Sequence, residues 1–210
     1  MNTEPRLSSR GRTVEAPASR RSTAAAERGG FSLPELIVTM SISAALVGMA
    51  LPHVDLAGHR SRAAVVEMST TLSAAQSRAV LGQHDVIVAF DTLAGTVRVH
   101  LDANNDGAVQ TTEHARLVQV SEGIRFSRGA APAMALGGSG VTFTRVQDGL
   151  PSVVFHRNGS ASQAGVVYLV PGGDGGMSMD VDHVRAVEVA RPTGRATCLR
   201  VKDGAWGESC

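Results

Sequence analysis

Aromatic residues are scarce in this 210-residue chain, at 3% of the sequence. A folded core must therefore be built from Val, Ala, Leu, Ile and Met. The sequence contains no phosphate-binding loop and no Gly-x-Ser-x-Gly pattern, and its seven His show no paired metal-ligand spacing. It has only two Cys and no CxxC spacing, so no cysteine metal site is expected. These absences predict a role other than catalysis.

A strong excess of one charge is also lacking once the first thirty residues are set aside. Residues 1–30 carry six Arg and three Glu, a balance of +3, whereas the whole chain carries +1, so the remainder carries −2. A general nucleic-acid binder would need clustered Lys and Arg for phosphate contacts. Residues 1–30 are rich in Ala, Ser and Pro without an apolar run, and we do not expect them to fold alone.

One long apolar run follows this basic segment. Residues 31–52 number 22, which at about 1.5 Å per residue is enough to cross a hydrocarbon core of roughly 30 Å. Its polar residues after position 35 are hydroxyls that can bond back to carbonyls of their own helix, namely Thr39, Ser41 and Ser43. Its one carboxylate, Glu35, needs a partner, because a charge at membrane depth costs on the order of a few kcal/mol.

The sequence Gly-Phe-Ser-Leu-Pro-Glu-Leu at residues 30–36 resembles the cleavage and methylation signature of type IV prepilins and pseudopilins. The resemblance implies that a prepilin peptidase and N-methyltransferase cuts after Gly30, removes residues 1–30 as a leader and methylates Phe31. It also implies that Glu35 pairs with the N-terminal amine of a neighbouring subunit. Two opposite charges that meet in lipid offset each other's burial cost. An ordinary signal anchor with an unrelated Glu is the alternative.

The Arg excess before the apolar segment predicts its orientation, with the leader in the cytoplasm and the residues after Pro52 outside it. Because the expected cut precedes the apolar segment, that segment stays with the mature chain, unlike a secretory signal peptide. The resemblance implies a single-pass protein of the bacterial inner membrane with a periplasmic C-terminal domain.

Residues 53–82 are predicted to form an amphipathic stem helix. Its apolar residues recur at spacings of 3, 4, 3 and 4 and share one face, at Val65, Met68, Leu72, Ala75 and Ala79. We expect Pro52 to loosen or kink the helix and Gly82 to act as a left-handed cap. The apolar face is expected to pack against the sheet that follows.

After Gly82 the period changes to 2 and β-branched residues dominate, so residues 83–210 are predicted to form an antiparallel β domain. The predicted strands are 86–90, 96–101, 116–120, 124–127, 141–145, 153–156, 166–170, 184–190 and 196–201. Residues 129–140 are rich in Gly and Ala and are predicted to be a flexible loop.

The segments Val-Val-Phe-His-Arg-Asn-Gly at 153–159 and Val-Ala-Arg-Pro-Thr-Gly-Arg at 189–195 resemble the GspH/FimT family of minor pseudopilins and minor pilins. That resemblance implies an α+β, pilin-like fold, with a long N-terminal transmembrane and stem helix before a two-sheet antiparallel β domain. The first hypothesis is a minor pseudopilin of a type II secretion system. The second is a FimT-like minor pilin of a type IV pilus, acting in DNA uptake or pilus assembly. Either would have other pseudopilins or pilins and inner-membrane lipid as partners.

Residues 102–113 match the spacing of a twelve-residue calcium loop, with Gly107 at the sharp turn. The ligand positions are Asp102, Asn104, Asp106, Ala108 (through its carbonyl), Gln110 and Glu113. Both neighbouring segments are predicted as strands, so this is not an EF-hand. Two interpretations stay open: a calcium loop between strands, or an Asn/Asp/Gly-rich turn without an ion. No other cofactor is expected.

Cys198 and Cys210 lie in the segment predicted to be outside the cytoplasm, where a disulfide between them would pin the last strand. Two free thiols are the alternative.

Arg195, Arg200 and Lys202 form a basic cluster in the sequence. DNA-binding FimT-like pilins use a C-terminal Gly-Arg-x-Arg patch, and Gly194-Arg195 matches its first half, but Thr197 replaces the second Arg. DNA contact is therefore the less favoured hypothesis, against solvated charge at a strand end.

Overall fold

The computed structural model describes residues 30–50, 55–110, 112–173, 176–177 and 180–209. The chain divides into two compact units, Met1–His53 and Val54–Cys210. Among these residues, the first unit contains one α-helix, and the second contains one α-helix and the strands. The α+β class and the two antiparallel sheets predicted from the sequence are confirmed.

Helix α1 spans Leu33–Ala50. Its first turn contains Pro34, where the missing backbone N–H has no helical partner to lose. Three hydroxyls bond back to carbonyls three or four residues earlier, at 2.8–3.0 Å, as the sequence predicted: Thr39, Ser41 and Ser43. These three hydroxyls are thus satisfied within the helix. The predicted kink at Pro52 lies outside the described residues.

Helix α2 spans Leu56–Gly82. The carboxylate of Asp55 caps its start by accepting the backbone N–H of Gly58 at 2.8 Å. The left-handed cap falls on Gln83 (φ 55°), not on Gly82 as the sequence predicted. Gln83 Nε2 donates to the carbonyl of Val80 at 2.7 Å, so this side chain satisfies a terminal helix carbonyl that a glycine would leave open.

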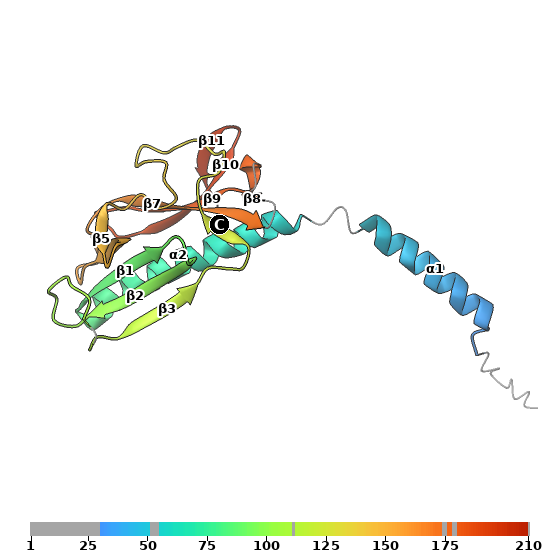
Figure 1. Ribbon diagram of the computed structural model, residues 1–210, viewed down its shortest axis with the longest axis horizontal. Coiled ribbons are helices and arrows are strands. Elements are labelled where there is room, and N and C mark those ends of the chain that lie inside the picture. The colour runs from blue at the N-terminus through green and yellow to red at the C-terminus, as the bar shows by residue number, and fades with distance from the viewer. Residues whose placement is uncertain (1–29, 51–54, 111, 174–175, 178–179, 210) are drawn as a thin grey trace, which may run out of the picture. The chain divides into compact units, whose positions relative to one another are not determined.

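Two antiparallel sheets follow α2 (Figure 1). The first has the strand order β3-β2-β1-β6-β5. Its strands are β1 (Asp85–Asp91), β2 (Thr96–Asp102), β3 (Ala115–Gln119), β5 (Arg145–Gln147) and β6 (Leu150–Phe155). The second has the order β11-β10-β9-β7-β4, with β8 paired to β7. Its strands are β4 (Ile124–Phe126), β7 (Gly165–Gly173), β8 (Gly176–Met177), β9 (Arg185–Val189), β10 (Ala196–Lys202) and β11 (Ala205–Glu208). A 3₁₀ turn, η2 (Val181–His183), precedes β9.

One hydrophobic core joins α2 to both sheets. The predicted apolar face of α2 is buried throughout, at Val65, Met68, Leu72, Ala75 and Ala79. The same cluster contains Val86, Val88 and Phe90 from β1 and Val187 and Val189 from β9. Phe90 stacks on Phe143 with ring centroids 5.5 Å apart. The expectation that the stem helix packs on the sheet is confirmed, and the helix contacts both sheets.

The predicted strand at 141–145 is wrong. Val141 forms only an isolated bridge to Val167, and β5 begins at Arg145 in the other sheet. Between them Thr142 Oγ1 accepts the Val166 N–H at 2.7 Å, so a side chain replaces a backbone acceptor. The β-branched residues here belong to a segment that crosses from one sheet to the other, which strand propensity cannot show.

Two hairpins were missed by the sequence reasoning. Asp148-Gly149 joins β5 to β6, and Asp203-Gly204 joins β10 to β11. All four residues have positive φ, between 52° and 79°. Asp-Gly is a preferred pair for two-residue hairpin turns, so the signal was present in the sequence.

The segment 129–140 is irregular, as expected, but it is fastened to the second sheet. The Tyr168 hydroxyl accepts the Met134 N–H at 3.0 Å and donates to the Gly137 carbonyl at 2.8 Å. Trp206 Nε1 donates to the Pro132 carbonyl at 2.9 Å. The two largest polar aromatics of the domain thus hold this segment against the sheet.

The shared core predicts that Leu72→Ala lowers the free energy of unfolding by about 2–5 kcal/mol, because Leu72 is fully buried and would leave a cavity. Leu81→Ala, on the same helix but 85% exposed, is the matched control and should change it by less than about 0.5 kcal/mol. Urea unfolding followed by circular dichroism measures both. Equal effects of the two substitutions would contradict the packing described for α2.

Candidate functional site

Gly30, Phe31 and Glu35 lie at the start of the first unit. Gly30 and Phe31 precede α1, and Glu35 occupies its first turn. A carboxylate near a helix N-terminus interacts favourably with the helix dipole. All three residues are exposed, and Phe31 is 76% exposed, so none of the described residues of this unit shields the peptide bond between Gly30 and Phe31.

The large apolar side chains of α1 are exposed around the whole helix. Exposed fractions range from 48% to 74% at Leu33, Leu36, Ile37, Val38, Met40, Ile42, Leu46 and Val47. A helix that is apolar on every side is normally buried in protein or lipid. The described residues of this unit therefore do not bury the apolar surface of α1, which would have to be buried by other groups.

No helix among the described residues is both long and apolar enough to cross a membrane. The predicted segment 31–52 ends outside those residues.

In the 102–113 loop, side-chain carboxylates accept hydrogen bonds from backbone N–H groups of the same loop. Asp102 is fully buried, and its two carboxylate oxygens accept the N–H groups of Asp106 at 3.1 Å and Gly107 at 2.7 Å. Glu113 closes the loop by accepting the N–H of Ala103 at 3.0 Å and of Gln110 at 3.1 Å. The sequence spacing therefore does bring both ends of the loop together.

Asp106 stands at the centre of this loop. It accepts the N–H of Ala108 at 2.8 Å and the side-chain amides of Asn104 at 2.9 Å and Gln110 at 2.6 Å. The backbone bond from Ala108 is the main cause that lowers the pKa of the Asp106 carboxyl. The guanidinium of Arg145 donates to the Gly107 carbonyl at 2.5 Å, which places a cation beside the loop.

Across the described residues, no group of three or more His, Cys, Asp or Glu converges as metal ligands would. Calcium binding by the loop stays a prediction.

Cys198 is buried in β10, in the core shared with α2. The β10–β11 hairpin turns the chain back, so that the N–H of Ser209 donates to the Cys198 carbonyl at 3.0 Å. The residue after Ser209 is Cys210, which lies outside the described residues. The disulfide stays a prediction. The β10–β11 hairpin brings Ser209, the residue before Cys210 in the sequence, next to Cys198.

The three basic residues of the predicted DNA contact are not brought together. Arg195 precedes β10, whereas Arg200 and Lys202 lie near its other end. At about 3.3 Å per residue, Arg195 and Lys202 are separated by roughly 23 Å along the strand. Arg195 and Lys202 are exposed, and Arg200 is half-buried on the face toward α2. A single phosphate group could not contact all three.

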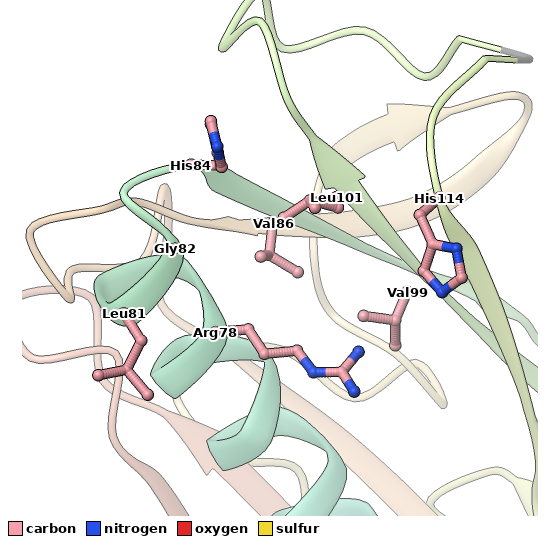
Figure 2. A pocket seen from close by; sticks show the side chains of 8 residues that line it. All are labelled: Arg78, Leu81, Gly82, His84, Val86, Val99, Leu101 and His114. Carbon is pink, nitrogen blue, oxygen red and sulfur yellow. The ribbon is translucent and has the colours of Figure 1, made fainter.

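An apolar cavity of about 480 Å³ opens beside the C-terminal end of α2. Figure 2 shows the side chain of Arg78 of α2 extending toward Val99 of β2, and Leu81 of α2, Val86 of β1 and Leu101 of β2 also line the cavity. The lining also includes His84 and His114. Its described lining residues supply one guanidinium and two imidazoles, and none of them carries a carboxylate, hydroxyl or thiol.

Two residues that the sequence reasoning did not single out, Arg62 and Arg185, lie close to Arg200. The three arginines come from α2, β9 and β10 and line one polar hollow. Strand pairing between β9 and β10 could have suggested the proximity of Arg185 and Arg200. No sequence signal indicated that Arg62 joins them.

Comparison with known proteins finds no matching family model and no curated protein with a matching sequence. A solved structure of the minor pseudopilin EpsH from the type 2 secretion system of Vibrio cholerae aligns with a TM-score of 0.44 and 12% identity. The alignment covers 70% of this chain and 99% of that one. At this level of similarity, the function of this chain has to be inferred from its own residues.

Calcium binding to the 102–113 loop predicts a higher melting temperature in calcium chloride than in chelator. At a calcium concentration of about 100 times the dissociation constant, the stabilisation would be about 2.7 kcal/mol. Asp102→Asn should abolish the difference, because a neutral amide replaces a charged oxygen ligand. Asp203→Asn, in a turn at the other end of the domain, should retain it. A melting temperature independent of calcium would leave the loop as an ion-free turn.

The Cys198–Cys210 disulfide predicts that reduction or Cys210→Ser lowers the free energy of unfolding by roughly 2–3 kcal/mol, as for closure of a loop of this size. Intact-mass analysis before and after alkylation counts the thiols, and urea unfolding measures the loss. Two thiols that alkylate readily in the oxidised, folded protein would refute the bridge.

Proposed function

We propose that the chain is a minor pseudopilin of a type II secretion system. A prepilin peptidase cleaves it between Gly30 and Phe31, and the mature chain joins other pseudopilins in a periplasmic pseudopilus. The role is mechanical, since the helix holds the subunit in the filament and the β domain faces the other subunits or the exported cargo.

The observation that carries this proposal is the surface of α1, which is apolar on all sides and exposed throughout its described length. Water is an unfavourable environment for such a surface, at about 25 cal/mol for each Å². Lipid can cover the helix before assembly, and the helices of neighbouring subunits can cover it in a filament. The hydroxyls of α1 bond to carbonyls of the same helix, so they need no hydrogen-bond partner in lipid or in a filament.

Glu35 supports the same proposal, because it is the one charged residue of α1. In lipid or in a helical filament core it requires a cation. Cleavage after Gly30 would create such a cation, the amine of Phe31, on every subunit. The motif at 30–36 thus places a new positive charge and a fixed negative charge at the same end of every helix.

Under this proposal the protein is a single-pass protein of the inner membrane before assembly. The six Arg of residues 1–30 favour a cytoplasmic leader and a periplasmic β domain.

A FimT-like minor pilin that contacts DNA is the alternative. It draws less support, because Arg195 lies at the opposite end of β10 from Arg200 and Lys202. The remaining arguments from α1 and Glu35 apply equally to a pilin.

Cleavage is tested by expressing the chain with and without a prepilin peptidase and measuring its intact mass. We expect a chain that begins at Phe31 and carries one additional methyl group only when the active peptidase is present. Gly30→Val should leave the leader attached, because a bulky residue replaces the one before the cut. Retention of residues 1–30 by the wild-type chain in its own cell would refute the proposal.

The role of Glu35 is tested with Glu35→Gln, which keeps the shape and removes the charge. We expect cleavage to continue and the amount of chain in sheared filaments to fall at least about tenfold, which corresponds to 1.4 kcal/mol. Glu122→Gln, an exposed carboxylate of the β domain, is the control and should assemble normally. Normal assembly of the Glu35 variant would show that its charge has no partner in the filament.

A further inference from the structure

Strand β3 has one unpaired edge. It ends the first sheet, and among the described strands only β2 pairs with it. Val120 N–H donates to the Gly95 carbonyl at 2.9 Å, and bonded pairs alternate along antiparallel strands, so the even-numbered residues of β3 bond to β2. The N–H and C=O groups of Ala115, Leu117 and Gln119 therefore point away from β2, where another strand could pair with them.

A groove runs between β3 and α2, here called the α2–β3 groove. Three cavities lie along it, with volumes of about 480, 30 and 10 Å³. The first and second share Arg78 and Val99 in their lining, and the second and third share Thr71 and Val118. The groove thus follows the length of β3 and is widest beside His114.

The wide end of the α2–β3 groove carries cations and no acid. Arg78 extends toward Val99 of β2 (Figure 2) and lines both the first cavity, with His114, and the second, with Arg116. Neither lining contains a carboxylate. The ion pairs found among the described residues involve neither Arg78 nor Arg116. A carboxylate from another molecule would complement these two charges.

The acids closest to the groove along the chain have other partners. Glu113, next to His114, accepts two N–H groups of its own loop. The carboxylate of Asp85, next to His84, lies 2.7 Å from His156 Nδ1. Glu67, at the narrow end, accepts the Ser121 hydroxyl at 2.8 Å. These contacts hold the three carboxylates away from Arg78 and Arg116.

An unpaired strand edge beside a groove suits an extended peptide. Its main chain bonds to the edge, and alternate side chains enter the groove. Arg116 points from β3 toward α2, and an inward-pointing charge on an edge strand disfavours pairing with an apolar strand or with a second copy of the same edge. The same charge favours a strand that places a carboxylate opposite it.

We propose that β3 binds an extended segment of a partner protein, which adds to the first sheet as a further strand. A carboxylate of this segment meets Arg78 and Arg116, and a large apolar side chain fills the cavity of about 480 Å³. Alternate residues of a strand face the same side, so the segment carries the acidic and the apolar residue two positions apart. The site uses only the second unit, so it goes beyond the proposed function and does not depend on it.

The test uses the full chain in detergent micelles and the peptide acetyl-Thr-Val-Thr-Glu-Thr-Phe-Thr-amide, whose Val, Glu and Phe share one face. At saturating peptide, we expect amide hydrogen exchange, followed by NMR, to slow at least about tenfold at Ala115, Leu117 and Gln119, because these N–H groups gain carbonyl partners. The amides of Arg116 and Val118, which already bond to β2, are the internal control and should not change.

Matched variants test the contacts of the segment. Arg78→Gln and Arg116→Gln should each weaken peptide binding about tenfold, because each removes a charged hydrogen-bond donor. Arg60→Gln, exposed on the same helix, should bind like the wild type. Leu117→Pro removes an N–H that points away from β2, so it should keep the sheet and lose the peptide. If Leu117→Pro does not fold, the two arginine variants decide.

Four results would overturn the proposal. One is the absence of slower exchange at Leu117 at every soluble peptide concentration. Another is equal binding of a peptide with Lys in place of Glu, which removes the carboxylate from recognition. Signal shifts at Val99 and Leu101 without protection of Leu117 would leave a cavity ligand in place of an added strand. Protection of Leu117 that rises with protein concentration, without peptide, would replace the partner by a second copy. Each of these leaves cleavage at Gly30 untouched, so failure of the site is distinguishable from failure of the proposed function.

Discussion

Burial of one face of α2 is the constraint on which the rest of the second unit depends. Leu72 and Ala79 have no exposed surface, and the residues around them come from both sheets. Burial of each large apolar side chain of this face contributes about 1.5–3 kcal/mol. Aromatics are few, so the core depends on close packing of Val and Ala along the helix. The two sheets share one core because the same helix face packs against both.

The two ends of α2 meet different surroundings. At its C-terminal end the helix stops at Gln83, beside a cavity lined largely by Leu and Val. At its N-terminal end Asp55 caps the helix, and the inner face of the second sheet changes from apolar to arginine at Arg185 and Arg200. The inner face of the second sheet is therefore charged at the end near Asp55, and the cavity at the other end of α2 is also lined by Arg78, His84 and His114.

Irregular segments of the domain are ordered by a few polar side chains. Tyr168 holds residues 129–140 through its hydroxyl, and Asp102 holds the turn of the 102–113 loop through two backbone N–H groups. Both side chains are fully buried at their strands and reach outward to the backbone of a loop. Buried polar groups need partners, so the loop conformations and the sheet stabilise one another.

The sequence by itself determined the apolar α1 with its single acid, because that segment is apolar throughout. It also determined the buried face of α2 and all but one of the strands it predicted, because each of these depends on a local period of 3.6 or 2. It also determined that Asp102 and Glu113 close one loop, because twelve residues with Gly107 in left-handed conformation bring the ends together. Tertiary structure decided the crossing at 141–145, the separation of Arg195 from Lys202 and the meeting of Arg62, Arg185 and Arg200. The separation of Arg195 from Lys202 follows from the length of β10. The proximity of the three arginines follows from the packing of α2 across two paired strands. Neither leaves a periodic signal in the chain.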